Sequence, residues 1–407
     1  MKRILFAAAI AALIVVAPGV VGATDLFGVA ATYGGGTITQ TASSLPDLIE
    51  ALINNQDAFA PLVGQDFTGS LTYYGLPDAV TVDVQGQTQL TITSPLTGLN
   101  KTFTGTSRED LEDQLTDWLL KEGGSEAAKL VQAAAEQSAA AITDGNPSSA
   151  TARMADRAFR TFGLFPASPA MLGSESGNGG GIWLHARRSE ADTPVGSVNG
   201  ADYELDLPWW INFGRHVSLI GAGSGQYMDD EGTAIYGVGG DMGLAIRPIV
   251  RDQGSPIGWQ ITPFTGFQGI GTYDGATGGL LNEFGVTSRL EVALTDDILL
   301  VIANQYSRLG SMKLKIQDVE IDPKVEQDVL KNGVMLDAPL WGGAPLYANG
   351  FFVDTRFLQD AAVDSYQTLG AGLSLRGNAI SLNAYLSHDF ASDYSSWNAG
   401  VGLCFGL

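Results

Sequence analysis

The chain has 407 residues, of which 45% are apolar, 16% are charged and 52 are glycine. Typical soluble domains carry about 25% charged residues and about 7% glycine, so this chain is poor in charge and rich in glycine. It has 22 basic and 44 acidic residues, a formal net charge of −22. It lacks the basic stripe of a nucleic-acid-binding protein, which excludes DNA or RNA binding as its main activity.

The first 23 residues have the pattern of a cleaved secretory signal peptide. A positive start, Met1-Lys2-Arg3, precedes an unbroken apolar run from Ile4 to Val16, and small residues lead up to Ala23. Signal peptides have an apolar core of about 7–15 residues, which is shorter than a membrane helix. After residue 23 no stretch approaches the ~20 apolar residues of a spanning helix, so we expect any later membrane contact to be made by a β-barrel.

Composition divides the remaining chain into three parts. Residues 24–106 are rich in Thr, Gly and Gln and predict a small β-rich or α+β module. Residues 107–178 predict helices and a linker. From residue 179 to 407 the side chains alternate with period 2, which is typical of β-strands.

The first two parts contain recognisable elements. In the module we expect strands near 67–74 and 79–93 and a short helix at 45–52. Ser107 precedes an acidic first turn and is typical of a helix N-cap. The three helices that we expect in the second part span about 107–122, 126–142 and 151–162.

The last strand predicts an unusual two-faced sheet. In water its large apolar face would be exposed, whereas in a bilayer that face would contact lipid while the small face lines a lumen. The large apolar residues are Trp397, Ala399, Val401, Leu403, Phe405 and Leu407, and the small or polar ones are Asn398, Gly400, Gly402, Cys404 and Gly406.

The same alternation upstream places charges opposite large apolar residues. This polar-in, apolar-out pattern is that of a transmembrane barrel, although a soluble sandwich or soluble barrel would also alternate. We expect the acids at 202–206 to be balanced by Arg187, Arg247 and Arg289. The charged residues predicted to line the lumen are Asp202, Glu204, Asp206, Asp241, Arg247, Arg289 and Glu291.

One hairpin supports the barrel interpretation. If Gly377-Asn378 is a two-residue turn, Leu375 pairs with Ile380, and Gly370 pairs with Tyr385 further along. The apolar residues of both strands then share one face, and an aromatic ring lies beside a bare glycine, which helps to fix the register.

The number of strands tests whether the barrel closes. Eleven strands can be identified between 181 and 407, whereas single-chain bacterial barrels have an even number. The best candidate for a twelfth strand is Ser311–Glu320. Asp322-Pro323 then predicts the start of a short helix that ends near Lys331, ahead of Asn332-Gly333.

Glycines are concentrated on the inward-facing positions of these strands. Glycine weakens a strand, so the concentration needs a reason. Our hypothesis is that a helix, either 126–142 or 151–162, occupies the lumen against Gly370, Gly372 and Gly402. The alternative is that glycine only relieves crowding in a small barrel. For the set at 221–225 the inward face is ambiguous.

These residues together resemble an outer-membrane β-barrel of the autotransporter-like type, over roughly residues 150–407. The family's last strand carries a polar residue, a glycine two positions later and two hydrophobic residues spaced by one, and Asn398, Gly400, Leu403 and Phe405 match it. The resemblance implies an assembly signal at these positions that is read by the barrel-assembly machinery. The chain departs from the family because it ends Phe405-Gly406-Leu407, and its N-terminal segment is far shorter than most passengers.

No catalytic, metal or cofactor site is predicted. Gly223-Ser224-Gly225 lacks the spacing of a nucleophile elbow, and His216 lies eight residues away along the same strand. His185, His388 and Asp389 could imitate a protease site, but structural roles are favoured. The three histidines and the single Cys404 are too widely spaced in the sequence to predict a zinc site.

We therefore expect a non-enzymatic, bacterial outer-membrane barrel of about twelve strands, in contact with outer-membrane lipid, that anchors, exports or is plugged by its small N-terminal module. The alternative is a porin-like diffusion channel in which the acidic residues of the lumen would favour the passage of cations. A soluble secreted β protein that binds a ligand is the third possibility. The sequence does not decide whether residues 24–145 are periplasmic, exposed on the surface or a plug.

Overall fold

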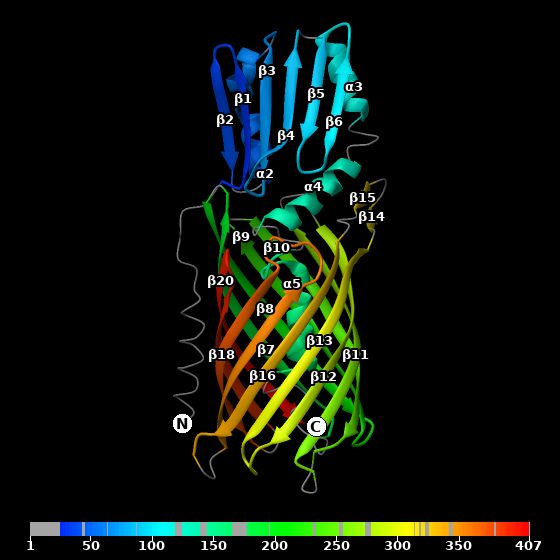
Figure 1. Ribbon diagram of the computed structural model, residues 1–407, viewed down its shortest axis with the longest axis vertical. Coiled ribbons are helices and arrows are strands. Elements are labelled where there is room, and N and C mark those ends of the chain that lie inside the picture. Colours follow the sequence, from blue (N-terminus) through cyan, green and yellow to red (C-terminus); the bar gives the residue numbers. More distant parts are fainter. Residues whose placement is uncertain are drawn as a thin grey trace.

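The computed structural model shows a β-sheet module stacked on one end of a long β-barrel (Figure 1). The predicted signal peptide, residues 1–23, lies outside the described residues. The structure describes residues 25–406 except for 43–44, 63, 87, 119–123, 139–144, 165–176, 195, 231–232, 252–254, 273–277, 313, 317–318, 322–324, 342–344 and 378–379.

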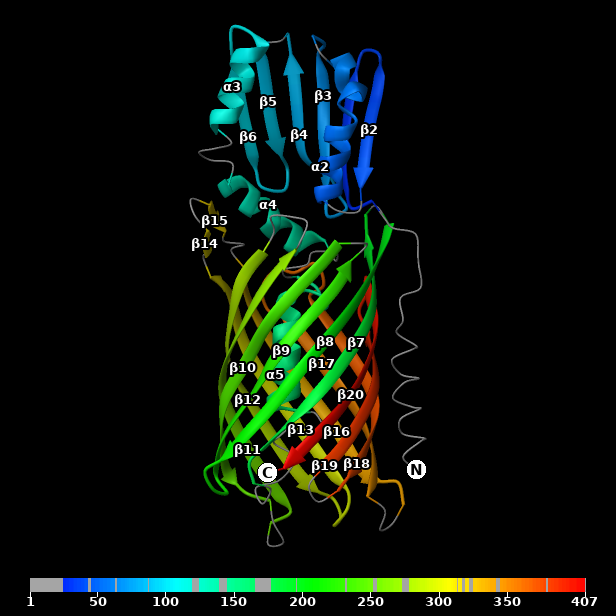
Figure 2. The same ribbon diagram turned by 180° about the vertical axis from the view of Figure 1, so that it is seen from behind.

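The N-terminal module is a six-stranded antiparallel sheet with helices on one face, as Figures 1 and 2 show from opposite sides. The strand order is β2-β1-β3-β4-β5-β6. Its elements, with the helix that follows, are β1 (Phe27–Tyr33), β2 (Gly36–Ala42), α2 (Leu45–Asn54), the 3-10 helix η1 (Gln56–Leu62), β3 (Phe67–Tyr73), β4 (Leu76–Gln85), β5 (Gln89–Ser94), β6 (Leu99–Thr104), α3 (Arg108–Trp118) and α4 (Gly124–Gln137).

Alternation along the strands builds the core of this module. Val84, Ile92 and Phe103 are buried together with Leu111 and Trp118 of α3, so the apolar face of the sheet is covered by the apolar face of the helix. The single strand expected at 79–93 is two strands, β4 and β5, because the chain reverses between Gln85 and Gln89, which pair with each other, and so forms a hairpin.

Residues 179–406 form a closed antiparallel barrel of twelve strands, which confirms the expected fold class. Each strand pairs with the next, and β20 pairs with β7 to close the barrel. The strands are β7 (Gly179–Thr193), β8 (Gly196–Asn212), β9 (Val217–Asp230), β10 (Thr233–Ile249), β11 (Ile257–Thr272), β12 (Gly278–Ala293), β13 (Leu299–Met312), β16 (Glu326–Pro339), β17 (Leu346–Phe357), β18 (Ser365–Arg376), β19 (Ile380–Phe390) and β20 (Tyr394–Gly406).

The twelfth strand is β16, so its expected position at Ser311–Glu320 and the expected helix ending near Lys331 were wrong. The earlier segment forms only a small separate hairpin, β14 (Leu314–Ile316) and β15 (Val319–Ile321). In β16, buried Lys331 and Met335 alternate with half-buried Asn332 and exposed Val334. This strand was not predicted because a lysine is rarely buried and an Asn-Gly pair usually marks a turn.

The β18–β19 hairpin has the expected faces but a register shifted by two residues. Leu375 pairs with Leu382 rather than Ile380, and Gly370 pairs with Ser387 rather than Tyr385. The amide of Gly377 donates to the carbonyl of Ile380, so the pairing continues to these two residues, and the connection lies one position later in the chain than the expected Gly377-Asn378 turn. A shift of two keeps every side chain on its side of the sheet, because side chains alternate with period 2.

The outside of the barrel is apolar. Every barrel strand except β9 carries large apolar side chains that are exposed, among them Leu207, Phe267, Phe284 and Leu369. On β9 the outward positions include Gly221, Gly223 and Gly225, which settles the ambiguous parity of that set. An apolar belt around a closed barrel of even strand number is the surface of an outer-membrane protein. Among the described residues, no helix is long and apolar enough to cross a membrane.

The belt predicts the effect of a charge on the outer surface. Leu207 lies near the middle of β8 and is 47% exposed. Replacing it with arginine, Leu207→Arg, should cost about 2–4 kcal/mol of folding free energy in lipid vesicles, because the charge would face hydrocarbon. Urea unfolding in vesicles measures this. Thr39→Arg, on the exposed sheet of the module, is the control and should change little; equal effects would contradict a lipid-facing Leu207.

Candidate functional site: the helix inside the barrel

Among the residues that the structure describes, one helix, α5 (Ala150–Phe162), lies inside the barrel with its axis along the lumen (Figures 1 and 2). Ser149 caps its N-terminus, where the side chain accepts a hydrogen bond from the amide of Ala152. Nearly all of its side chains are buried, and it packs against β9 to β13 and β16. The structure therefore places the helix at 151–162 in the lumen and the Ala-rich α4 outside it, at the mouth.

Three arginines of α5 pair with a ladder of acids on the barrel wall. Arg153 pairs with Asp202, and Arg160 pairs with both Glu204 and Asp206, at 3.1 Å from the latter. Arg153 and Arg160 lie two helical turns apart, and their partners are carboxylates at alternate positions along β8. Because these side chains are buried, each charge needs its partner.

Arg157 makes the most complete of these contacts. Its Nε and Nη2 donate to the two carboxylate oxygens of Asp241 at 2.6 and 3.2 Å, and its Nη1 donates to Ser224 Oγ at 2.8 Å. Both members of the ion pair are buried. A two-point guanidinium–carboxylate contact is directional, so it fixes both the height and the rotation of the helix in the lumen.

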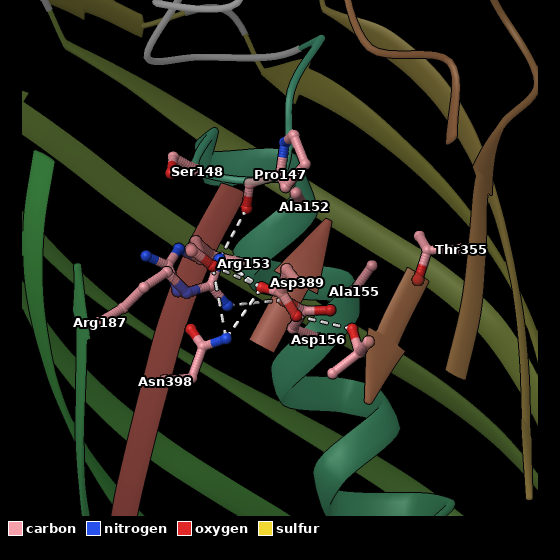
Figure 3. Close-up of polar contacts among 12 residues, drawn as sticks. Pro147, Ser148, Ala152, Arg153, Ala155, Asp156, Arg187, Thr355, Asp389 and Asn398 are labelled. Carbon is pink, nitrogen blue, oxygen red and sulfur yellow. Dashed lines mark hydrogen bonds and ion pairs between the residues drawn. The ribbon is translucent and has the colours of Figure 1, made fainter. Parts of the chain in front are cut away.

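The one acid of α5, Asp156, faces the opposite side of the barrel. It accepts hydrogen bonds from Lys331 Nζ at 2.5 Å, Tyr366 Oη at 3.0 Å and Arg187 Nη2 at 3.1 Å. Figure 3 shows Arg187, together with Asp389, gathered beside this face of the helix. The helix thus presents cations to the acidic wall and an anion to the basic wall.

The wall also holds the backbone of the helix segment. Arg187 Nη1 donates to the carbonyl of Pro147 at 2.9 Å, before the helix starts. Gln305 Nε2 donates to the carbonyl of Ala155 at 3.0 Å, and Arg289 donates to that of Gly163 just after the helix ends. These three donors reach carbonyls before, within and after the helix, so the barrel wall holds the segment along its whole length.

Below the charged layer, the lumen is filled by apolar side chains. Phe159, Phe162 and Leu164 from the end of α5 are buried among residues such as Trp210 and Phe351 of the wall. This cluster lies at the end of the barrel where β7 begins and β20 ends. Large apolar side chains therefore occupy inward positions at this end of the barrel, where the sequence pattern predicted small or polar ones.

The structure places the predicted lumen charges in the interior, with different partners from those expected. Asp202, Glu204 and Asp206 are balanced by arginines of α5, whereas the wall arginines expected to balance them contact other groups. Arg247 Nη1 donates to Ser218 and its Nε to Gln260, at 2.8 and 3.1 Å. Arg289 and Arg251 both pair with Glu291, at 3.0 and 3.1 Å.

The glycines expected to face the helix mostly face aromatic rings of the neighbouring strand. Phe351 lies over Gly370 and Trp183 over Gly402, leaving no room for a side chain at either glycine. The helix instead touches two other glycines. A Cβ at Gly333 would lie 2.8 Å from Leu164, and one at Gly243 would lie 3.1 Å from Phe162. The proposed contact was therefore assigned to the wrong strands.

The predicted assembly signal occupies both faces of β20. Asn398 points inward, is buried and donates to Asp389 at 2.9 Å, and Gly400 lies under the ring of Tyr385. Leu403 and Phe405 point outward and are exposed.

The histidines are dispersed across the barrel. His185 bridges Tyr385 and Asp206 inside, at 2.9 and 3.1 Å, whereas His388 lies on the outer face against Trp397. His388 and Asp389 therefore point to opposite sides of the wall and do not form the pair considered from the sequence.

No protein-family model matches the chain, and no curated protein matches it. Solved structures of similar shape include three autotransporter domains. The translocator domain of NalP from Neisseria meningitidis is 14% identical, with 63% of this chain and 97% of that one covered and a TM-score of 0.45. The beta domain of the Bordetella autotransporter BrkA is 12% identical, with 56% of this chain and 99% of that one covered and a TM-score of 0.40. The transport unit of the autotransporter AIDA-I from Escherichia coli is 10% identical, with 63% of this chain and 98% of that one covered and a TM-score of 0.40.

The closed wall, the apolar belt and the buried helix define the class of this protein. It is an outer-membrane β-barrel of twelve strands whose lumen contains a helix of its own chain. In shape it is similar to autotransporter translocators.

The buried pair of Arg157 and Asp241 predicts a non-additive double mutant. Arg157→Met alone should lower the free energy of unfolding by about 3–5 kcal/mol, because Asp241 would remain buried without its partner. Adding Asp241→Leu should restore most of the loss, since two apolar groups replace the pair. Urea unfolding in detergent micelles measures both. Arg108→Met, which breaks an exposed pair with Glu112, should cost no more than about 1 kcal/mol; additive losses in the double mutant would contradict the pairing.

Proposed function

We propose that this protein is a surface anchor that displays its N-terminal module outside the cell and closes its own pore. The observation that carries the proposal is the path of the chain. The module lies at one end of the barrel, α5 runs down the lumen, and β7 begins at the other end, beside the end of β20 (Figure 1).

The strand count supports this orientation. Twelve strands bring both ends of the barrel to the same side, and a barrel inserted from the periplasm keeps its ends there. The opposite end, which carries the module, then lies outside. It also carries the connection that holds the β14–β15 hairpin, and outer-membrane barrels have their longer loops on the outer side.

The contents of the lumen support a closed anchor rather than a porin-like channel. The acids that would bias a channel toward cations are neutralised by arginines of α5, and the apolar cluster fills the end of the barrel near Gly179. The proposed role is mechanical and not catalytic. Insertion would use the exposed outer residues Leu403 and Phe405 of β20 as the signal for the barrel-assembly machinery.

The docking of the module also supports display as one rigid body. Val198, near the start of β8, is buried in the core of the module with Leu26, Phe27 and Tyr73. The amide of Val363 donates to the carbonyl of Gly145, which ties the segment before α5 to the β17–β18 connection. The module therefore rests on the rim of the barrel.

Cysteine labelling on intact cells tests the orientation. The single native thiol, Cys404, is 1% exposed and should not react. A Thr39→Cys variant, on the open face of the module, should react with a membrane-impermeant maleimide in intact cells. An Asp296→Cys variant, in the β12–β13 turn at the opposite end, should react only after lysis. The reverse pattern would place the module in the periplasm and refute the proposal.

Conductance in planar bilayers tests the closed lumen. The full chain should show no resting conductance. Deleting residues 150–162 should produce a cation-preferring conductance, because Asp202, Glu204, Asp206 and Asp241 would lose their arginines and face water. Deleting residues 124–137, which form α4 outside the barrel, is the matched control and should leave the pore closed. An open full-length pore would contradict self-closure.

A further inference from the structure

The sheet of the N-terminal module has two edges, and they differ. In the strand order β2-β1-β3-β4-β5-β6, the first and last strands each have a neighbour on one side only. An edge strand presents backbone N–H and C=O groups that can pair with another strand, and proteins usually protect it with a lysine, a proline or a bulge. β6 contains Lys101, and α3 packs against it. The seven residues of β2, GTITQTA, include no charged residue, no proline and no shift of register.

The turn between β1 and β2 decides which backbone groups of β2 face the free edge. Tyr33 pairs with Gly36 across a two-residue turn, so these two residues form a hydrogen-bonded pair. Hydrogen-bonded and non-hydrogen-bonded pairs then alternate along the antiparallel ladder. It follows that every second residue of β2 directs its N–H and C=O away from β1. These residues are Thr37, Thr39 and Thr41.

The outward groups match a second copy of the same strand. When two β2 strands run antiparallel about a two-fold axis at Thr39, the Thr39 residues of the two copies lie opposite each other, and Thr37 of one lies opposite Thr41 of the other. The N–H groups then meet C=O groups in hydrogen-bonded pairs. Such an interface uses the same surface twice and closes after two copies. Pairing of β2 with β6 of another copy would instead continue from copy to copy.

The side chains of β2 also suit this pairing. Within the sheet, Thr32 lies opposite Thr37 and Thr91 opposite Thr102, with 3.1 Å between the hydroxyl oxygens in both pairs. A second β2 continues the row through Thr37 into the other copy, and no like charges meet there, because β2 has none. On the opposite face, half-buried Ile38 gains cover from the added strand.

We propose that two copies of this protein associate through the β2 edges of their modules and form one continuous antiparallel sheet. The strands of the module run along the barrel axis (Figures 1 and 2), so antiparallel pairing places the two barrels at opposite ends of the pair. The two copies therefore lie in membranes that face each other. This arrangement in cells rests on the proposed function, because the module must be displayed outside.

Cross-linking of single-cysteine variants tests the interface, with the full chain in detergent micelles. Native Cys404 is 1% exposed and does not compete for the reagent. A short bis-maleimide should give at least about tenfold more covalent dimer with Thr39→Cys than with Thr102→Cys, because proximity raises the effective concentration of the two thiols. Thr102 is the matched control, since it is exposed on the same face at the other edge of the sheet. Equal yields from the two variants overturn the proposal.

A mixture of Thr37→Cys and Thr41→Cys tests the direction of the paired strands. Antiparallel pairing places these two positions opposite each other, so the mixture should give more covalent dimer than either variant gives alone. The same yield or a lower yield from the mixture overturns the antiparallel arrangement.

An exchange of charges tests whether the pair joins facing membranes. Lipid vesicles that carry the native chain should cluster, which light scattering measures. Thr39→Lys places like charges opposite each other and should weaken pairing by about fivefold, and Thr39→Glu should do the same. Mixing Thr39→Lys vesicles with Thr39→Glu vesicles should restore clustering, because opposite charges then meet. Thr102→Lys vesicles are the control and should cluster like the native ones.

Dispersed native vesicles, or a mixture of Thr39→Lys and Thr39→Glu vesicles that stays dispersed, overturn the proposal. Both tests use purified protein, so their results do not depend on which side of the membrane the module occupies in cells. Cysteine labelling on intact cells decides that question separately, and a failure of edge pairing leaves the proposed display unaffected.

Discussion

The position of the lumen helix depends on the pairing of buried charges. Arg153, Arg157 and Arg160 lie against carboxylates of β8 and β10, out of reach of bulk water. Removing one partner of such a pair leaves a bare charge in a poorly solvated place, at a cost of several kcal/mol. Any shift or rotation of the helix would break several pairs at once. The helix therefore has one position in the lumen. It is specified by the acidic wall, by the space that Gly243 and Gly333 leave for Phe162 and Leu164, and by the apolar cluster at the end of the helix.

Much of the barrel could be predicted because its signal is local. Each strand carries its own period-2 pattern, and an apolar face that would be untenable in water is visible within a dozen residues. β16 escaped prediction because its inward face carries Lys331, which reads as a solvent-exposed residue. Its partner, Asp156, lies 175 residues earlier in the chain, and no local pattern connects the two. The register of the β18–β19 hairpin was misplaced because alternation does not encode which residues form the connection: moving it by one residue shifts the pairing by two and leaves every side chain on the same face.

The candidate site could be predicted only in part. The parity of Asp202, Glu204 and Asp206 was enough to place them on the inner face. Their partners were not predictable, because wall arginines and helix arginines look alike in sequence, and only the packing of α5 shows which of them reach β8. The apolar layer was hidden for another reason. Inward positions keep the same parity along a strand whether they meet water, a helix or one another, so a change from polar to apolar filling leaves the period unchanged.

The route of the chain through the barrel has a mechanical consequence. The folded module lies at one end of the barrel and β7 begins at the other, so α5 is threaded through a closed ring of strands, like the axle of a rotaxane. The module is too large to pass through the ring, and the other end of α5 leads into the ring itself. It cannot be lost while both the ring and the module stay folded. A pulling force on the module from outside would first load the ion pairs between α5 and the barrel wall. It would then load the backbone hydrogen bonds that β7 makes with β8 and β20.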